Sequence, residues 1–228
     1  MPQLSVIVPA YNEAQTIRQI LEKINSVDID KEIIAIDNGS TDETGKILRS
    51  IKMNNLKVIH HCSNRGKGAA VLTGMVNATG ELVIIQDADL EYDPKDYPRL
   101  IGPILSGKAD MVLGARFLQG QQGLFVHRLG NRFLTRFLNF LFHCRLNDYA
   151  TCYKVARKNT FAMLNLKTTG FDIDVEIVCN ALKKKLSIFE VPVSYYPRTY
   201  RQGKKIRWRD GIWTILSMFK CRFNRIIP

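Results

Sequence analysis

The first half of the chain alternates short apolar, β-branched runs with stretches of helical periodicity. Runs of this length, bounded by polar turn residues, predict buried β-strands. The predicted strands span Leu4–Val8, Ile33–Ile36, Lys57–His60, Leu82–Gln86 and Met111–Gly114. Regular alternation of strands and helices predicts an α/β fold, with a mostly parallel, Rossmann-like sheet flanked by helices on both faces.

Two of the expected helices have recognisable start signals. Asn12 with Gln15 and Ser40 with Glu43 have capping-box spacing, each a few residues after a strand. The second half is less regular, with helical patterns near residues 128–143, 172–184 and 212–226. No Pro/Gly/Ser-rich linker interrupts the chain, so we expect one domain over residues 1–228.

Charge divides the chain into two unlike halves. Residues 1–110 carry a net charge of −3 and residues 111–228 a net charge of +15. The basic half requires an anionic partner. Three kinds of partner satisfy that requirement: nucleic acid, an anionic bilayer or a phosphorylated substrate. Because we recognise neither a signal peptide nor an apolar run of spanning length, we expect a cytoplasmic protein that touches membranes without crossing them.

The five cysteines are scattered and without C-x-x-C spacing, which predicts neither disulfides nor a zinc site.

An acidic row follows the fourth predicted strand. Asp87, Asp89 and Glu91 alternate along the chain, so in an extended segment they project to the same side. Three carboxylates in register repel one another unless a cation lies between them, and hard oxygen ligands suit Mg²⁺ or Mn²⁺. The alternative is a solvated acidic turn before a helix at Pro94. The strongly apolar strand before the row favours the metal site.

Polar segments at the other strand ends have weaker signals. Asp37 is placed to accept hydrogen bonds from a base or ribose, or equally to serve a turn or helix cap. Residues 65–68, Arg-Gly-Lys-Gly, have the composition of a phosphate cradle, although the pattern alone is weak. Neither a Walker A sequence nor G-x-G-x-x-G follows any strand, which argues against an NTPase or a dinucleotide-dependent dehydrogenase.

Seven segments in order resemble the family 2 glycosyltransferases, and most closely the polyprenyl-phosphate branch that includes dolichyl-phosphate mannosyltransferase. They are VIVPAYNE (6–13), DNGSTD (37–42), NRGKGAA (64–70), QDADLEYDP (86–94), GARF (114–117), DYATCYK (148–154) and VPVSYYPRTYRQGKK (191–205). The resemblance covers nearly the whole chain.

The resemblance implies a GT-A fold and a nucleotide-sugar donor, either GDP-mannose or UDP-glucose. It implies that the donor is bound by a set at the strand ends: Pro9, Tyr11, Glu13, Asp37, Lys67, Asp87 and Asp89. It assigns Mg²⁺ or Mn²⁺ to Asp89 and Glu91, and it makes Asp89 and Arg116 the catalytic residues. Two positions depart from many relatives, which have Gln at Glu91 and Asp at Asn38.

The expected acceptor is a polyprenyl or dolichyl phosphate. A sugar hydroxyl needs a general base, whereas a phosphate monoester is already anionic and needs cations to hold it in line. The candidate phosphate-binding residues are Arg116, Arg128, Arg132, Arg198 and Lys205. We therefore expect donor and metal binding in residues 1–110 and acceptor binding in residues 111–228, with inversion by single displacement.

The lipid part of such an acceptor requires an apolar surface. Apolar residues within 133–142 and 212–226 repeat at helical spacing beside basic residues, which is typical of helices at a bilayer interface. For 133–142 we favour membrane contact; for the C-terminal helix, core packing is an equal alternative.

Two other functions are weighed. Transfer to a sugar hydroxyl is disfavoured because Gln202 lies too far from Arg207 and Trp208 to form Q-x-x-R-W. A basic nucleic-acid-binding protein would leave the acidic row unexplained, so we expect no nucleic-acid partner.

Overall fold

The computed structural model describes residues 2–118, 125–198 and 208–223. Each of the five predicted strands is confirmed. They are β1 (Leu4–Ala10), β2 (Lys31–Asp37), β3 (Leu56–His60), β4 (Leu82–Ile85) and β5 (Met111–Ala115). Two further strands, β6 (Lys154–Arg157) and β7 (Ile188–Pro192), were not predicted from the sequence.

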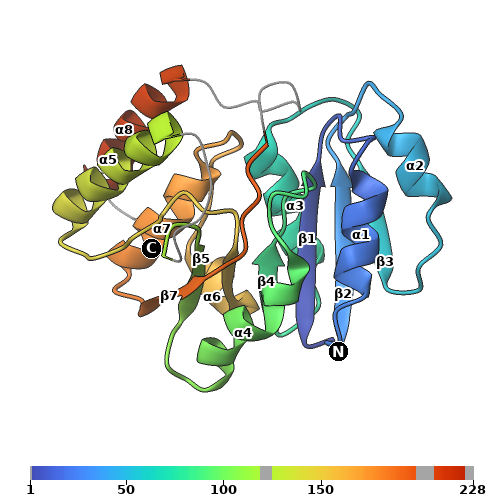
Figure 1. Cartoon of the computed structure of the whole chain (residues 1–228), viewed down its shortest axis with the longest axis horizontal. Coiled ribbons are helices and arrows are strands. Elements are labelled where there is room, and N and C mark those ends of the chain that lie inside the picture. Colours follow the sequence, from blue (N-terminus) through green and yellow to red (C-terminus); the bar gives the residue numbers. More distant parts are fainter. Residues whose placement is uncertain (1, 119–124, 199–207, 224–228) are drawn as a thin grey trace.

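One sheet contains all seven strands, in the order β3-β2-β1-β4-β6-β5-β7 (Figure 1). It is mostly parallel, as predicted, but β6 runs antiparallel to both of its neighbours, β4 and β5. Strands from the second half of the chain therefore extend the sheet begun by the first half.

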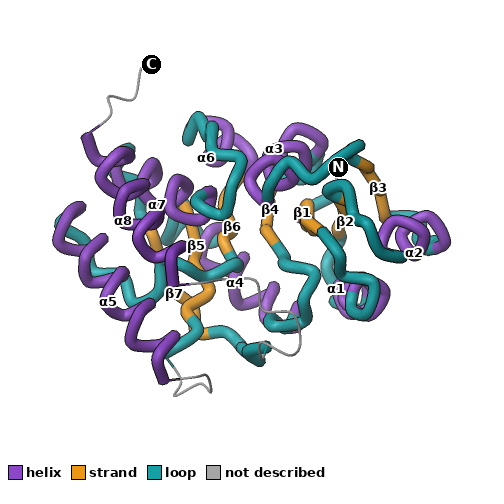
Figure 2. The backbone as a smooth tube through the Cα atoms, turned by 90° about the horizontal axis from the view of Figure 1, so that it is seen from above, coloured by secondary structure: helices purple, strands orange, loops and turns teal. Residues whose placement is uncertain are grey.

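Helices cover both faces of this sheet, which confirms the predicted architecture. Figure 2 shows α3 and α6 on one side of the row of strands and α1 and α4 on the other. The helices are α1 (Ile17–Asn25), α2 (Thr44–Ser50), α3 (Lys67–Asn77), α4 (Tyr97–Leu105), α5 (Phe125–Phe142), α6 (Lys158–Met163), α7 (Ile173–Lys183) and α8 (Trp208–Phe223). A short 3₁₀ turn, η1 (Pro94–Asp96), precedes α4.

The core is built from the apolar runs that predicted the strands. The side chains of β4 are buried on both faces, as expected for a central strand between two helical layers. On α3, a Cβ at Gly74 would lie 2.3 Å from Cγ2 of Ile7, so glycine is needed for that helix to pack against β1.

The two predicted capping boxes are wrong. α1 begins at Ile17 and α2 at Thr44, and neither Thr16 nor Glu43, the residues before them, caps its helix with its side chain. The Thr44 N–H donates to Asp42 Oδ1 at 2.9 Å. Asn12 and Ser40 bind each other's loops instead. The Asn12 backbone N–H donates to Ser40 Oγ at 3.0 Å, and the Thr41 N–H donates to Asn12 Oδ1 at 2.9 Å. The two side chains thus join the loops that follow β1 and β2.

The amphipathic helices α5 and α8 lie side by side at one end of the molecule (Figures 1 and 2). Phe137 of α5 and Phe219 of α8 contact each other edge to face, with ring centroids 5.3 Å apart. The helical patterns near 128–143, 172–184 and 212–223 are confirmed by α5, α7 and α8, and residues 224–226 lie outside the described part. No described helix combines the length and apolarity that crossing a bilayer requires.

Candidate active site

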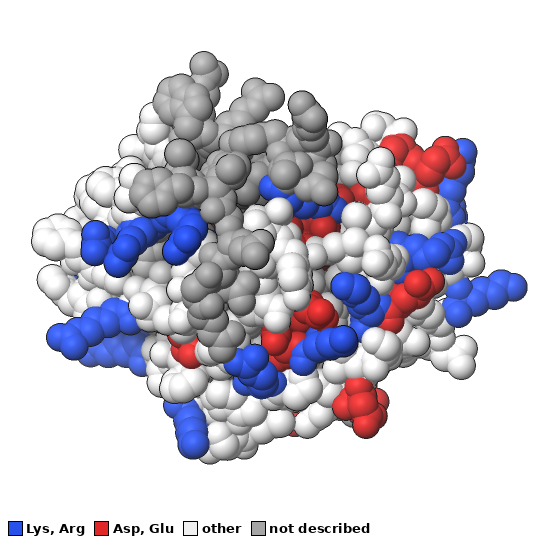
Figure 3. Space-filling model, in the orientation of Figure 1, with Lys and Arg blue, Asp and Glu red and all other residues white. Residues whose placement is uncertain are grey.

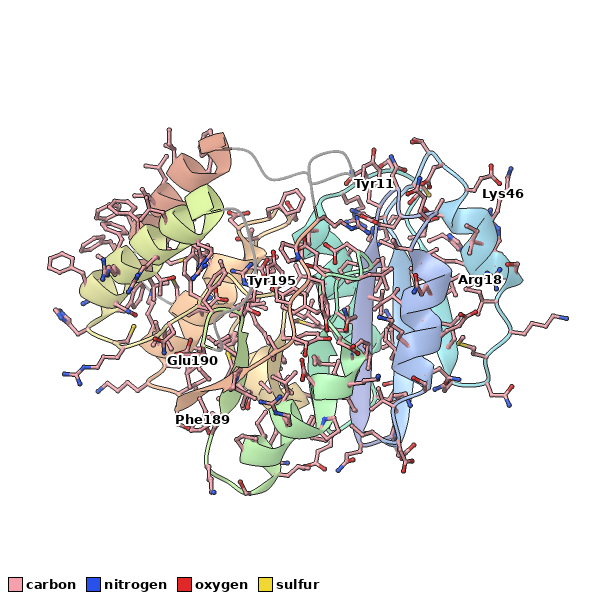
Figure 4. The ribbon with its side chains drawn as sticks, viewed as in Figure 1. Tyr11, Arg18, Lys46, Phe189, Glu190 and Tyr195 are labelled. Atoms are coloured by element: carbon pink, nitrogen blue, oxygen red, sulfur yellow. The ribbon has the colours of Figure 1, made fainter. Side chains whose placement is uncertain are left out.

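The predicted donor residues follow strands that end along one edge of the sheet. β1 is parallel to β2 and to β4, so the segments after Ala10, Asp37 and Ile85 leave the sheet in the same direction. Pro9 is half-buried within β1. Tyr11 lies at the upper end of β1 in Figure 4.

The predicted extended row beyond β4 is wrong, because β4 ends at Ile85, residues 88–91 form a turn and Leu90 has a φ of 64°. The three carboxylates of this acidic row still concentrate negative charge. Asp89 Oδ1 accepts a hydrogen bond from the Glu91 backbone N–H at 3.1 Å. Burial, Asp87 and Glu91 together raise the pKa of Asp89 to about 7, against the opposing effect of that hydrogen bond and of Arg198. Burial and like charge are the two causes that destabilise an ionised carboxylate. Burial and the two neighbouring carboxylates therefore outweigh the positive charge that Arg198 brings to Asp89.

Arg198 joins this row to the segment after β1. Its Nη1 lies 2.9 Å from Glu13 Oε2, and its Nε donates to the Asp89 carbonyl at 2.7 Å. The Arg198 backbone N–H donates to Glu91 Oε1 at 2.7 Å, and Tyr195 Oη donates to Glu91 Oε2 at 3.0 Å. Glu13, Asp89, Glu91 and Arg198, all predicted from the sequence, thus meet at one place. Figure 4 shows Tyr195 near the middle of the molecule.

Lys67 contacts the row at Asp87, with Nζ 2.9 Å from Oδ1. Its Nζ also lies 3.2 Å from Oδ2 of Asp174 on α7. Burial alone would lower the pKa of Lys67, but Asp174 and Asp87 outweigh it and raise that pKa well above its ordinary value. Lys67 is therefore a cation held between two carboxylates.

The glycine-rich segment before α3 is not an open phosphate cradle. The Gly68 N–H donates to the Gly170 carbonyl and the Ala69 N–H to the Thr169 carbonyl, each at 3.1 Å. A Cβ at Gly66 would lie 2.3 Å from the Thr169 oxygen. The glycines allow residues 168–170 to approach α3, so two amides at the helix N-terminus are occupied by the protein itself.

Asp37 is engaged in its own loop. Its Oδ1 accepts from the Ser40 N–H at 3.0 Å and its Oδ2 lies 3.0 Å from His60 Nδ1. This matches the turn role that the sequence left open beside nucleotide binding. The neighbouring Asn38 donates to Asn64 Oδ1 at 3.0 Å and to the Gly66 carbonyl at 3.1 Å. The amide donors of Asn38 make both contacts, which the carboxylate of an aspartate at this position could not.

Arg116, after β5, forms a buried ion pair with Asp148. Its Nε lies 2.7 Å from Asp148 Oδ2 and its Nη2 2.8 Å from Oδ1, and the Asp148 side chain is fully buried. Asn131 of α5 donates to Asp148 Oδ1 at 3.0 Å. Two guanidinium nitrogens of Arg116 are thus committed to Asp148, and its phosphate-binding role stays a prediction.

The other predicted acceptor residues lie in different places. Arg128 and Arg132 are exposed on α5, within one turn of Asn131 on either side. Arg198 contacts Asp89 and Glu91 of the acidic row, as described above. Lys205 lies outside the described residues.

Asp89 and Glu91 are the two hard oxygen ligands that this edge offers for a divalent cation. Among the side chains that the structure describes, in residues 2–118, 128–198 and 211–223, no three His, Cys, Asp or Glu are grouped to hold a metal ion by themselves. A cation here would need further ligands, such as the oxygens of a diphosphate. The residues fit Mg²⁺ or Mn²⁺ because both are carboxylates, and because burial together with the neighbouring carboxylates raises the pKa of Asp89, an effect that a bound cation would oppose.

Sequence reasoning missed the partners that hold these groups. Asp148 and Lys154 lie in the DYATCYK segment, whose residues had no individual roles, and Asp174 lies at the start of α7. Lys154 is fully buried and its Nζ lies 2.7 Å from Asp174 Oδ1. The one available signal was an isolated lysine next to the apolar Val155 and Ala156, a charge that a buried strand carries only with a partner.

Comparisons with known proteins identify the family of this chain. The family model described as glycosyl transferase family 2 matches residues 5–164. The chain is 29% identical over 204 residues to the low-salt glycan biosynthesis hexosyltransferase Agl6 of Haloferax volcanii. The matched residues cover 86% of this chain and 48% of Agl6. It is 26% identical over 216 residues to a dolichol-phosphate mannosyltransferase of Pyrococcus furiosus. This match covers 89% of this chain and 59% of the mannosyltransferase. The chain therefore spans roughly half the length of both relatives.

Solved structures show the same fold. One is the glucosyl-3-phosphoglycerate synthase of Mycobacterium tuberculosis in complex with Mn²⁺, uridine diphosphate and glucosyl-3-phosphoglycerate. It is similar with a TM-score of 0.75 and 22% identity, covering 97% of this chain and 80% of that chain. The fold is therefore the GT-A fold that the sequence motifs implied.

We expect Asp148→Asn to lower the free energy of unfolding by about 3–5 kcal/mol, because it leaves the buried charge of Arg116 without its partner. Urea denaturation measures the change. The matched control is Glu81→Gln, which breaks the ion pair of Glu81 with Arg157, whose side chains are 54% and 45% exposed. That change should cost at most about 1 kcal/mol. Equal losses in the two variants would contradict the assignment of Arg116 to a buried pair.

Proposed function

Because the chain belongs to glycosyl transferase family 2, whose model matches residues 5–164, we propose that it transfers a hexose from a nucleotide sugar to a polyprenyl phosphate. The product is a lipid-phosphate sugar, formed with inversion at the anomeric carbon. The observation that carries the proposal is the acidic row, in which Asp89 lies beside Asp87 and Glu91 with its pKa raised to about 7.

Donor binding is proposed at the carboxyl ends of β1, β2 and β4. Pro9, Tyr11 and Glu13 follow or end β1, Asp37 ends β2, and Asp87 and Asp89 follow β4; Lys67 reaches the same edge from α3. Parallel sheets of this kind bind ligands at this edge. GDP-mannose and UDP-glucose are the two candidate donors, and the names of the mannosyltransferase and hexosyltransferase relatives support a hexose.

Asp89 and Glu91 would hold Mg²⁺ or Mn²⁺, which supplies positive charge to the departing diphosphate when bound. The raised pKa of Asp89 supports this assignment, because a bound cation would oppose that effect. The solved synthase of Mycobacterium tuberculosis contains Mn²⁺ with uridine diphosphate, which is consistent with metal use in this fold.

The choice of a phosphate acceptor is supported by the state of the carboxylates. Transfer to a hydroxyl needs a carboxylate or His free to take a proton. Around this edge, Asp89 and Glu91 are the proposed metal ligands, and four other acidic side chains are paired with cations: Glu13 with Arg198, Asp87 with Lys67, Asp148 with Arg116, and Asp174 with Lys67 and Lys154. Although burial opposes it, the two lysines lower the pKa of Asp174, which makes that carboxylate a weaker base. An acceptor that arrives already anionic needs no such base.

Arginines are proposed to hold the acceptor phosphate. Arg128 and Arg132 are exposed on α5 beside Asn131, which contacts both Arg116 and Asp148. Guanidinium groups bind phosphate oxygens with two donors and stay charged. In this proposal Arg128 and Arg132 contact the phosphate, Arg116 anchors the site through Asp148, and Arg198 lies in the segment after β7. Lys205, outside the described residues, stays a predicted member of the set.

The surface of α5 and α8 is proposed to contact the membrane that carries the lipid. Its exposed apolar side chains are Leu129, Phe133, Phe140, Ile212, Trp213, Leu216, Phe219 and Phe223. Exposed basic residues, among them Arg136, Lys220 and Arg222, lie on the same two helices. Figure 3 shows Lys and Arg side chains with uncharged surface between them on the side that carries α5. Apolar side chains beside basic ones suit an anionic bilayer surface. The cytoplasmic location stays a prediction.

The proposed reaction is tested by Asp89→Ala with a panel of sugar nucleotides, Mg²⁺ or Mn²⁺ and a short polyprenyl phosphate. We expect transfer to fall at least about a hundredfold, because the variant loses charge at the leaving diphosphate. Asp93→Ala is the matched control. Asp93 accepts from the Lys95 N–H at 3.1 Å and caps η1, so its loss should leave transfer near normal. Near-normal turnover by folded Asp89→Ala would overturn the metal assignment.

The acceptor site is tested by the double variant Arg128→Ala/Arg132→Ala. We expect KM for the polyprenyl phosphate to rise by about tenfold or more, because two charge-assisted contacts are lost. The affinity for the donor, measured by calorimetry, should stay within about twofold. Arg145→Ala, which removes an exposed arginine beyond the end of α5, is the control. Equal losses in donor and acceptor binding would show that these arginines do not form the acceptor site.

Membrane contact is tested by Phe133→Ser/Trp213→Ser. Both side chains are exposed, so the variant should fold normally. Its flotation with phosphatidylglycerol vesicles should fall by about tenfold or more, because two large apolar side chains no longer enter the interface. Val76→Ser on α3 removes an apolar side chain that is 83% exposed and serves as the control. Unchanged vesicle binding by the double variant would remove α5 and α8 from the proposed surface.

A further inference from the structure

A chain of four buried or nearly buried charges leads away from the acidic row. Asp87 contacts Lys67 at 2.9 Å, Lys67 contacts Asp174 at 3.2 Å, and Asp174 contacts Lys154 at 2.7 Å. Lys154 also donates to the Thr151 carbonyl. The chain crosses four elements: the end of β4, α3, α7 and β6. It joins the acidic first half to the basic second half.

The four charges alternate and cancel. Two carboxylates face two ammonium groups, and the exposed fraction of the side chains is 25% for Asp87, 13% for Lys67, 18% for Asp174 and zero for Lys154. In such poorly solvated surroundings each charge acts over a longer distance than at the surface. Because Lys67 compensates Asp87, the negative charge left for a cation is that of Asp89 and Glu91, which matches a divalent ion.

The protein holds this chain rigidly. The carbonyls of Thr169 and Gly170 accept hydrogen bonds from the N-terminus of α3, which fixes the helix that carries Lys67. Glu176 accepts from the Lys167 and Thr168 N–H groups and so binds the same loop to α7, which carries Asp174. Lys67 and Asp174 are thus positioned by the same packing contact.

We infer that Lys154 and Asp174 are positioning residues that set the net charge beside the acidic row and thereby its affinity for a divalent cation. The inference rests on the proposed metal site but assigns a role to two residues outside it. Removing the charge of Lys154 leaves one uncompensated negative charge in the chain, which attracts the cation. Removing the charge of Asp174 as well restores neutrality.

The test is the affinity of the full chain for Mn²⁺, measured from the electron paramagnetic resonance signal of free Mn²⁺, with and without added GDP or UDP. Lys154→Met should bind Mn²⁺ roughly tenfold more tightly than the parent chain, because a buried unit charge acts on a divalent ion with little screening. Lys154→Gln removes the same charge but keeps an N–H donor for Asp174, and it should give the same rise. The charge-neutral Lys154→Met/Asp174→Asn should return to the parent affinity.

Matched controls separate charge from packing. Lys158→Met removes the same charge at an exposed position on α6 and should leave Mn²⁺ affinity unchanged. Asp172→Asn changes a carboxylate next to the start of α7 that lies 3.3 Å from Ser217 Oγ, and it should also have no effect. If Lys154→Met and Lys154→Gln weaken Mn²⁺ binding or leave it unchanged, or if the double variant keeps the tighter binding, the inference is overturned. Absence of Mn²⁺ binding by the parent chain would instead overturn the metal site of the proposed function.

Discussion

Compensation of negative charge beyond β4 is the constraint on which the rest of the site depends. Asp87, Asp89 and Glu91 lie close together in a partly buried segment, where like charges repel strongly. Lys67 pairs with Asp87. The Arg198 guanidinium pairs with Glu13 and donates to the Asp89 carbonyl, while the Arg198 backbone N–H donates to the Glu91 side chain. Asp89 still needs more positive charge beside it. The proposed function follows from the divalent cation that would supply this charge.

Both compensating cations bring a distant part of the chain with them. Arg198 holds the segment after β7 against the loop after β1 through Glu13, and Lys67 meets α7 through Asp174. Segments from the two halves of the chain are therefore joined by ion pairs beside the acidic row. Buried pairs contribute little net stability compared with apolar packing, but breaking one of them is costly. Such pairs favour one arrangement of the two halves.

The sequence predicted those features that depend on neighbouring residues. The five apolar runs gave five strands, and polar residues after them marked the edge of the sheet where Glu13, Asp89 and Glu91 lie. β6 was not predicted because only two apolar residues lie between buried Lys154 and exposed Arg157, too few to form a recognisable apolar run. The capping boxes failed because Asn12 and Ser40 contact each other across the fold, and the pairing of Arg116 with Asp148 was missed for the same reason. Contacts between distant residues leave no local pattern to read.

The antiparallel strand β6 has a consequence for how the molecule could be divided. β6 enters the sheet from the second half and fills the space between β4 and β5, both of which come earlier in the chain. A fragment that stops before residue 154 would leave β4 with unpaired N–H and C=O groups along one side, and strands open in this way invite aggregation. The boundary in charge between the two halves is therefore no boundary for folding: truncation cannot separate the nucleotide-binding edge from the arginine-rich helices, and their contributions have to be dissected by point substitution.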